Sequence, residues 1–261
     1  MFTGKRLVIT GVATPDSIAS AVVARARDGG AEVVATAFPR DMSAARDVLD
    51  GIDPDIPVVP VDATSSADLA SLAHIIKDRW GTLDGILHAI AYAPRSVLMS
   101  VMEADPDGIA IAMQSSVWTF SALARLLAGM APPDGASLVG LDFDSERAWP
   151  VYNWMGPCKA ALRSLSQYLA RDLGPQRIRS NLVAAGPLRT RAASGIPDFD
   201  LLLEAWRRQA PLAWDSSDAG PVADTVCFLL SDLSRAITGE VIHADGGFHA
   251  IATSLRDAGQ S

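Results

Sequence analysis

The fold is decided by a short strand, a glycine turn and a helix start, in Leu7-Val8-Ile9-Thr10-Gly11-Val12-Ala13-Thr14-Pro15-Asp16-Ser17-Ile18-Ala19. Gly11 permits a sharp turn at the strand end, because glycine has no Cβ to restrict its backbone. Ser17 precedes the Ala-rich segment Ile18–Asp28, whose apolar residues recur at helical spacing. A helix that begins there offers free N–H groups and a positive dipole end to a pyrophosphate. The stretch therefore predicts a βα unit that can bind a dinucleotide, although the standard GxGxxG pattern is absent.

Strand-like and helix-like segments alternate along the rest of the chain. The apolar runs are Leu7–Thr10, Val33–Ala37, Val58–Val61, Gly85–Ala89, Ala136–Leu141, Arg179–Val183 and Glu240–His243. The helical segments are Ile18–Asp28, Ala67–Arg79, Gln114–Gly129, Ala160–Leu173 and Ala219–Leu230. Continuous hydrophobicity is typical of strands that are buried on both faces of a parallel sheet. The pattern predicts an α/β, Rossmann-like, doubly wound parallel sheet of about seven strands, in a single domain that spans residues 1–261.

The composition excludes several classes of partner. The net charge is −8 and the isoelectric point is near 4.9, which disfavours nucleic acid and anionic membranes. Neither a signal peptide nor an apolar stretch of about 18 residues is found. The two cysteines, Cys158 and Cys227, have no metal-binding spacing and are expected to be reduced thiols. We therefore expect a cytoplasmic protein without a metal site.

Tyr152 and Lys159 form a pair that suits hydride chemistry. In a helix that ran through both residues they would lie on one face, about two turns and roughly 10 Å apart. The phenol can donate a hydrogen bond to an oxygen that gains negative charge, while the ammonium holds a hydroxylated cofactor. Pro157 lies between them and is tolerated only in the first helical turn or at a kink. The helix is therefore expected to begin near Met155, with Tyr152 in the preceding turn.

The expected carboxyl ends of the strands carry candidate cofactor residues. Phe38-Pro39-Arg40 follows the second strand, without the acidic residue that many NAD enzymes place there. Asp62, which precedes Ala63, has two possible roles: a hydrogen bond to an adenine amino group, or a cap on the helix that starts near Ser65. Small residues follow the fourth strand, where a backbone must pass close to a ligand. Main-chain groups after the sixth strand, in Ala184–Thr190, could hydrogen-bond a carboxamide.

Other segments are given less specific roles. Residues 191–209 interrupt the alternation with an irregular piece and an amphipathic segment around Leu201–Arg208, which suits a lid. The six tryptophans are expected to be packing anchors. Solvated or capping roles are expected for Asp142, Asp144 and Glu146, and solvated or packed positions for His74, His243 and His249.

Several motifs in order resemble one enzyme family. They are the Ser17-Ile18-Ala19 helix start, His88-x-Ile90, Gly140-x-Asp142-Phe143-Asp144, Tyr152-x6-Lys159, residues 179–187 and Ala244-Asp245-Gly246-Gly247. Together they resemble the NADH-dependent enoyl-acyl-carrier-protein reductases of the FabI/InhA type, within the divergent short-chain dehydrogenase/reductase superfamily. The similarity extends from about Lys5 to His249. Ordinary superfamily members have Tyr-x3-Lys, so the wider spacing is discriminating.

The resemblance implies a reaction and a set of sites. NADH would reduce the C=C bond of a trans-2-enoyl thioester, linked to acyl carrier protein or CoA, in fatty-acid biosynthesis. Tyr152 would hydrogen-bond the thioester carbonyl, Lys159 would hold the nicotinamide ribose, and Phe143 would lie beside nicotinamide and substrate. Substrate positions would be Tyr92, Phe143, Tyr152 and Met155. Cofactor positions would be Gly11, Ser17, Ile18, Phe38, Asp62, Ala63, Ile90, Ala91, Lys159, Gly186, Pro187, Leu188 and Thr190.

Two alternatives remain open on the sequence. Ala89 and Ala91 stand where close relatives have serine and glycine, and the lid is short. These departures fit a specialised enoyl or keto reductase of secondary metabolism. A dinucleotide-sensing protein without catalysis is the second alternative, although the presence of both Tyr152 and Lys159 argues against it.

The last two expectations concern the cofactor and the assembly. Phe38 stands where NADH-using relatives stack an aromatic ring on adenine, and Arg40 has no second basic neighbour for a 2′-phosphate, so NADH is preferred over NADPH. A homotetramer is expected, with a dimer as the fallback, because the superfamily that the motifs resemble forms tetramers, apolar residues recur at helical spacing in Ala160–Leu169 and the mean hydropathy is +0.20. The segments Ala219–Leu230 and Glu240–Ala244 add apolar surface, and the tail Ile251–Ser261 could lie across a neighbouring subunit.

Overall fold

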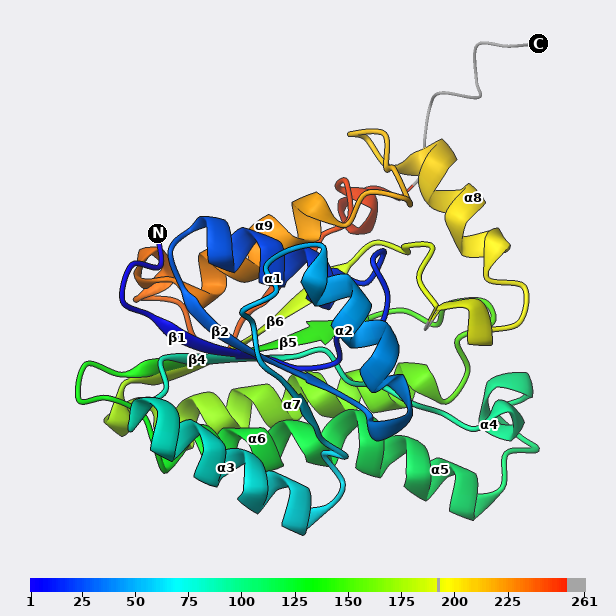
Figure 1. Cartoon of the computed structure of the whole chain (residues 1–261). Coiled ribbons are helices and arrows are strands. Elements are labelled where there is room, and N and C mark those ends of the chain that lie inside the picture. Colours follow the sequence, from blue (N-terminus) through cyan, green and yellow to red (C-terminus); the bar gives the residue numbers. More distant parts are fainter. Residues whose placement is uncertain (192, 253–261) are drawn as a thin grey trace, which may run out of the picture.

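Seven parallel strands form one sheet in the order β3-β2-β1-β4-β5-β6-β7 (Figure 1). The structure is a computed structural model that describes residues 1–191 and 193–252. The strands are β1 Arg6–Ile9, β2 Glu32–Ala37, β3 Val58–Pro60, β4 Gly85–His88, β5 Ala136–Asp142, β6 Ile178–Ala185 and β7 Val241–Ala244. The doubly wound α/β fold predicted from the alternation is therefore confirmed.

Helices cover both faces of this sheet (Figure 1). One face carries α1 Ile18–Asp28, α2 Met42–Asp50 and α9 Gly220–Leu230, and the other carries α3 Ser66–Trp80, α6 Thr119–Ala128 and α7 Met155–Leu173. The remaining α-helices of the described chain are α4 Arg95–Met99, α5 Pro106–Met113 and α8 Asp200–Gln209.

The two faces of the sheet have separate hydrophobic cores. Val8 points to the core under α3, α6 and α7, whereas its neighbours Leu7 and Ile9 point to the core under α1, α2 and α9. All three side chains are buried. A strand that must fill two cores has no polar face, which explains the continuous rather than alternating hydrophobicity of the sequence.

The sequence underestimated the helical content between β2 and β5. The segment expected as Gln114–Gly129 is the second half of a longer helical stretch, which begins with α5 and passes through a π-helical turn, Gln114–Trp118. Its start is set by Asp105, whose carboxylate accepts a 2.6 Å hydrogen bond from Gly108 N–H. Helices α2 and α4 were also missed: α4 has only five residues and buries two side chains, whereas the one-sided apolar pattern of α2, with Ala45, Val48 and Leu49 buried, was overlooked.

The position where open α/β sheets bind ligands is at the carboxyl end of β1 and β4. These strands are neighbours in the sheet, although the chain leaves them in opposite directions, which makes a topological switch point. Gly11 has φ +76°, and a Cβ built on it would lie 2.1 Å from the Ala89 carbonyl oxygen. Thr10 Oγ1 joins the two strand ends, because it donates to Leu87 O at 2.8 Å and accepts from Ala89 N–H at 3.0 Å. Glycine is thus required where the two backbones approach.

The helix start expected near Met155 is confirmed. Helix α7 begins at Met155, Pro157 lies in its first turn, and Tyr152 precedes it in a turn. The spacing of Tyr152 and Lys159 is therefore not that of one continuous helix.

The irregular segment after β6 leads into α8, as its amphipathic pattern predicted. Residue 192, inside this segment, and most of the tail expected to cross a neighbour, residues 253–261, lie outside the described part of the chain. No helix in residues 1–191 or 193–252 is long and apolar enough to cross a membrane.

Candidate active site

Tyr152 is presented by a strained turn. Val151 and Asn153 on either side of it have φ +61° and +41°, a region that a β-branched residue such as valine rarely occupies. The turn is held from outside, because the Asn153 amide donates to Leu98 O at 2.6 Å and the Trp154 indole donates to Val101 O at 3.0 Å. Backbone strain of this kind costs on the order of 1–3 kcal/mol per residue and clusters at functional sites. No pattern in the sequence predicted this strain.

The Tyr152 ring is buried against Phe143. The ring centroids are 4.8 Å apart, and Tyr152 is only 8% exposed. In the described part of the chain the phenol has no hydrogen-bond partner. Burial raises the pKa of Tyr152, and the nearby Asp142 carboxylate raises it further. Tyr152 is therefore a protonated donor with a free hydroxyl.

Lys159 points from α7 to the end of β5. Its ammonium donates to the Leu141 carbonyl oxygen at 2.7 Å, and the residue is 5% exposed. Burial lowers the pKa of Lys159, and the charge of Asp142 opposes this shift. An ammonium has three N–H donors, so two remain for a ligand.

Asp142 and Asp144 are buried, so the solvated or capping roles expected for them are wrong. Asp142 is 6% exposed and Asp144 is 7% exposed; β5 runs one residue further than its apolar pattern suggested, to Asp142, and Asp144 follows two residues later. Neither Asp142 oxygen makes a hydrogen bond of regular geometry. Burial raises the pKa of Asp142 to about 7, while Lys159 lowers it. Glu146, in contrast, is exposed and pairs with Arg163 at 2.5 Å.

An aromatic cover lies over Tyr152 and Phe143. It consists of Trp149, Trp206 from α8 and Phe248. Trp206 and Phe248 stack at 3.8 Å with an angle of 9°, and Trp206 lies 5.6 Å from Phe143. Trp149 contacts all three other rings, at 5.0 to 5.7 Å. The tryptophans of this cover therefore pack as expected, and they fasten α8 over Tyr152.

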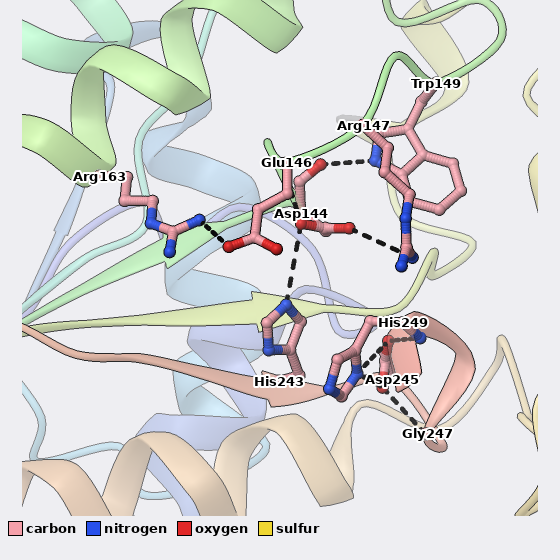
Figure 2. A network of polar contacts seen from close by, with 9 residues as sticks. All are labelled: Asp144, Glu146, Arg147, Trp149, Arg163, His243, Asp245, Gly247 and His249. Atoms are coloured by element: carbon pink, nitrogen blue, oxygen red, sulfur yellow. Dashed lines mark hydrogen bonds and ion pairs between the residues drawn. The ribbon is translucent and has the colours of Figure 1, made fainter. Parts of the chain in front are cut away.

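A polar network holds the aromatic cover in place (Figure 2). The Asp144 carbonyl accepts from the Trp149 indole at 2.5 Å. Asp245 accepts from the main-chain N–H groups of Gly247 and His249, both at 2.9 Å, and thereby fixes the short helix that carries Phe248.

Two half-buried histidines belong to this polar network. His243 and His249 stack with ring centroids 3.7 Å apart, and His243 faces Asp144 at 3.8 Å. Both histidines are therefore packed in the network, which fits the expectation for them, and His74 is exposed beside Asp78.

The turn after β1 has the features of an anion site. Ser17 caps α1 by accepting from Ser20 N–H at 3.1 Å. The N–H groups of Ile18 and Ala19 are in the first helical turn and have no intrahelical acceptor. Together with the open backbone at Gly11, these donors fit a pyrophosphate.

The end of β2 carries an acidic residue that the sequence analysis overlooked. Phe38 is 43% exposed, and the Arg40 guanidinium lies 4.9 Å from its ring centroid. Asp41 approaches Arg40 at 3.8 Å and pairs with Arg191 at 2.5 Å. The carboxylate counters both cations. Asp41 directly follows Arg40 in the sequence, so the sequence pattern was sufficient to identify it as a candidate acidic residue at the end of β2.

Asp62 does not cap the following helix. Ser65 is the N-cap of α3, whereas Asp62 Oδ1 accepts from the N–H and the hydroxyl of Thr64, at 2.9 and 2.7 Å. Its second oxygen stays available to an adenine amino group. Ala63 next to it is buried in the core under α3.

The loop after β4 is held by the π-helical turn. Ser115 Oγ donates to Tyr92 O at 2.8 Å, and Tyr92 N–H donates to Ser116 Oγ at 3.2 Å. Ile90 is half-buried and Ala91 is exposed. Tyr92 is 52% exposed, so the structure puts its ring at the surface, whereas Met155 lies in the core with Tyr152.

His88 ends β4 as a fully buried neutral base. Thr119 Oγ1 donates to Ser115 O, so the 2.8 Å contact between His88 Nε2 and Thr119 Oγ1 requires that Nε2 carry the proton. Burial, aided by the charge of Lys159, lowers the pKa of His88 to about 3.

The loop after β6 has fewer free main-chain groups than the sequence suggested. Gly186 N–H donates to Ala244 O, and Pro187 O accepts from the Trp214 indole. In the described chain the N–H of buried Leu188 has no acceptor. Leu188 and the half-buried Thr190 are therefore the groups left to hold a carboxamide.

Cation ligands do not gather anywhere in the described residues, where no group of three His, Cys, Asp or Glu is suitably placed. The assembled site thus consists of an unpaired phenol, an ammonium with two spare N–H groups and open main-chain donors along one edge of the sheet, as far as the described residues show.

Comparison with known proteins identifies similar chains. A family model described as enoyl-(acyl carrier protein) reductase matches residues 11–249. The NADH enoyl-acyl-carrier-protein reductase of Mycolicibacterium smegmatis is 37% identical over 262 residues, which cover 95% of this chain and 97% of the relative. FabI of Aquifex aeolicus is 38% identical over 260 residues, with 98% and 96% covered, and FabI of Bacillus subtilis is 36% identical over 253 residues, with 95% and 97% covered.

Proposed function

The chain belongs to the enoyl-(acyl carrier protein) reductase family, and we propose from this membership and the site that it reduces the C=C bond of trans-2-enoyl thioesters with NADH in fatty-acid biosynthesis. The observation that carries the proposal is the buried pair of Tyr152 and Lys159, each with donors that no group of the described chain accepts. The substrate is linked to acyl carrier protein or CoA.

The donors at the sheet edge fit NADH. The first turn of α1 suits its pyrophosphate, the exposed ring of Phe38 suits its adenine, and the free Leu188 N–H suits its carboxamide. We assign cofactor binding to Gly11, Ser17, Ile18, Phe38, Asp62, Ala63, Ile90, Ala91, Lys159, Gly186, Pro187, Leu188 and Thr190. When bound, NADH supplies the hydride that is added to the substrate.

Tyr152 acts on the thioester carbonyl. Its hydroxyl donates a hydrogen bond to the carbonyl oxygen, which gains negative charge as the enolate forms. A donor fixed in a buried site stabilises that charge more than water does, because it needs no reorganisation. The two spare N–H groups of Lys159 hold ribose hydroxyls and orient the cofactor. Phe143, buried against Tyr152, excludes water beside the reacting carbons.

Substrate binding involves the aromatic cover. We propose that residues 191–209 form the lid of a single NAD-binding domain, and that the acyl chain enters where Trp206 and Phe248 now pack. Tyr92, Phe143, Tyr152 and Met155 line this path in the proposal. Because Tyr92 is at the surface, its role belongs to the rim.

Charge at the end of β2 favours NADH over NADPH. A 2′-phosphate beside Phe38 would approach Arg40, but it would also meet the Asp41 carboxylate. The single Asp41 charge offsets one of the two guanidinium charges of Arg40 and Arg191 and would itself repel a phosphate, which weakens the attraction for a 2′-phosphate.

We further propose a homotetramer in the cytoplasm. Ile111, Trp118 and Tyr168 form part of an exposed apolar surface on the helices beside the site, at 44%, 36% and 58% exposure. β7 is an edge strand of the sheet, open to a second copy. Two such two-fold contacts make a tetramer. The two free, buried cysteines suit a reducing compartment. Light scattering that gave a monomer mass at micromolar concentration would contradict the assembly.

The function is tested by following NADH oxidation with crotonyl, octenoyl and dodecenoyl thioesters. We expect turnover with at least one chain length and a lower kcat/KM with NADPH. A protein that binds NADH but oxidises it with none of these substrates would refute the proposal. Turnover confined to other enoyl or keto compounds would instead point to a specialised reductase.

A further inference from the structure

A buried carboxylate without a well-formed hydrogen bond lies beside the catalytic pair. Asp142 is the last residue of β5 and is paired in the sheet with Ala184 of β6. It is 6% exposed, and in the described chain neither of its oxygens has a hydrogen-bond partner of good geometry, although, against the burial that raises the pKa of the carboxyl, the neighbouring Phe143 N–H lowers it. An unpaired buried charge is costly, and natural proteins rarely keep one without a use.

Asp142 is tied to Lys159 through the main chain. The Lys159 ammonium binds the carbonyl of Leu141, which shares a peptide bond with Asp142. No ion pair joins the Asp142 carboxylate to this ammonium, and both residues lie in the described part of the chain. The carboxylate therefore acts on the ammonium through its field and takes none of its N–H groups.

The other titratable groups around the pair are accounted for. Lys159 is also faced by Cys158 on its own helix and by neutral His88 of β4. Burial raises the pKa of Cys158, so it is a neutral thiol. Asp142 itself is faced by Lys159, by Asp144 and by Arg163, which is engaged with Glu146. Asp142 is thus the counter-charge of Lys159.

We propose that Asp142 is a positioning residue for the reaction proposed above, whose carboxylate keeps buried Lys159 an ammonium and Tyr152 a phenol while leaving all their free donors to cofactor and substrate. A direct ion pair would stabilise the ammonium more strongly, but it would occupy the N–H groups that must hold ribose. A field from a neighbouring, unbonded carboxylate supplies the stabilisation without that loss.

Asp144 provides a matched comparison. It is two residues away and equally buried, at 7% exposure, but it faces Arg147 at 4.0 Å and His243 at 3.8 Å and not the catalytic lysine. The same substitution at the two sites therefore separates loss of a buried carboxylate from loss of the counter-charge of Lys159.

The direct test measures Lys159 itself. The chain contains only three lysines, Lys5, Lys77 and Lys159, so ¹³Cε-lysine labelling gives three NMR signals, and Lys159→Arg assigns the third. We expect the pKa of Lys159 to fall by about one unit or more in Asp142→Asn, to return toward the wild-type value in Asp142→Glu, and to stay unchanged in Asp144→Asn.

Two results would overturn the proposal: an unchanged Lys159 titration in Asp142→Asn, or an equal shift in Asp144→Asn. If Asp142→Asn does not fold, the wild-type titration decides. If the two groups interact, the chemical shift of the Lys159 signal must show a second inflection at the pH where Asp142 titrates. A single inflection counts against the proposal. None of these readouts involves an enoyl substrate, so they can fail while the proposed reaction stands.

A measurement of NADH binding tests whether the charge of Asp142 matters for cofactor binding. NADH affinity, followed by its fluorescence, is expected to weaken at alkaline pH as Lys159 loses its proton. In Asp142→Asn this weakening should begin about one pH unit lower than in wild type and Asp144→Asn. Identical profiles in all three proteins would show that Asp142 does not position Lys159 for the cofactor.

Discussion

Two buried regions meet at the end of β5, and they differ in how many of their polar groups have hydrogen-bond or ion-pair partners. Around Asp142, the Tyr152 phenol, two Lys159 N–H groups and both carboxylate oxygens lack partners in the described chain. Around Asp144, hydrogen bonds and ion pairs join most of the residues of Figure 2, although Asp144 Oδ2 has only a 4.0 Å contact with Arg147, and this network holds Trp149 and Phe248 over the first region. Buried polar groups are normally satisfied, so we expect a ligand at the cluster of unpaired groups around Asp142 and a supporting role for the mostly paired groups around Asp144.

Removal of the Tyr152 hydroxyl should give the largest effect. Tyr152→Phe keeps the ring packed on Phe143 but deletes the free donor, so we expect kcat to fall by roughly 10²- to 10⁴-fold with little change in the unfolding free energy. Steady-state NADH oxidation and denaturant unfolding measure the two quantities. Tyr168→Phe, at an exposed position on α7, is the control and should keep full activity. Wild-type kcat in Tyr152→Phe would remove the distinction between the two regions.

Loss of the aromatic cover comes next. Trp206 is 1% exposed and stacked on Phe248, so Trp206→Ala should reduce the free energy of unfolding by about 3–5 kcal/mol. Leu201→Ala, at a 60% exposed position on the same helix, should cost much less. Guanidinium unfolding of both variants measures the difference. Equal losses would mean that the cover does not fasten α8.

The two carboxylates should differ in their effect on stability. The pKa of Asp142 is raised to about 7, so between about pH 4 and 7 the folded protein keeps a proton that the unfolded chain has released, and stability falls as pH rises through this window. Asp142→Asn removes the penalty and should stabilise the protein at pH 8, by at most roughly 4 kcal/mol at 1.36 kcal/mol per unit.

Asp144→Asn should instead destabilise the protein by about 1–2 kcal/mol, because it removes the charge that faces Arg147 and His243, while the amide oxygen can still accept from Glu146 N–H. Urea unfolding at pH 5 and pH 8 distinguishes these cases. A stability loss for Asp142→Asn at pH 8 would show that Asp142 is structural after all.

The smallest effect is expected at His243. Burial lowers its pKa, with a contribution from His249, so the folded state resists a proton that the unfolded chain takes up below about pH 6.5. Stability therefore falls as pH drops from about 7 to 5, and His243→Gln should reduce this fall by up to about 1 kcal/mol. His74→Gln, at an exposed position, should leave the profile unchanged. Thermal unfolding across this range measures both variants, and identical profiles for wild type and His243→Gln would contradict the prediction.

Local chemistry in the sequence determined the sheet and the start of α7. A strand buried on both faces must be apolar throughout, which made β1 and β6 visible without their neighbours. Proline restricts the backbone wherever it occurs, so Pro157 placed the helix start and put Tyr152 in a turn. The Tyr152-x6-Lys159 spacing and the strand-end motifs were enough to indicate the family.

The tertiary structure alone decided what surrounds the catalytic pair. Burial of Asp142 depends on β6, α7 and the aromatic cover, which come from distant parts of the chain, and the same residue at a free strand end would be solvated. The positive φ of Val151 depends on α4, which holds the turn from outside. Asp41 acquires its role only when Arg191, 150 positions later, is brought to it. The charge state and strain of a residue depend on neighbours that only folding supplies.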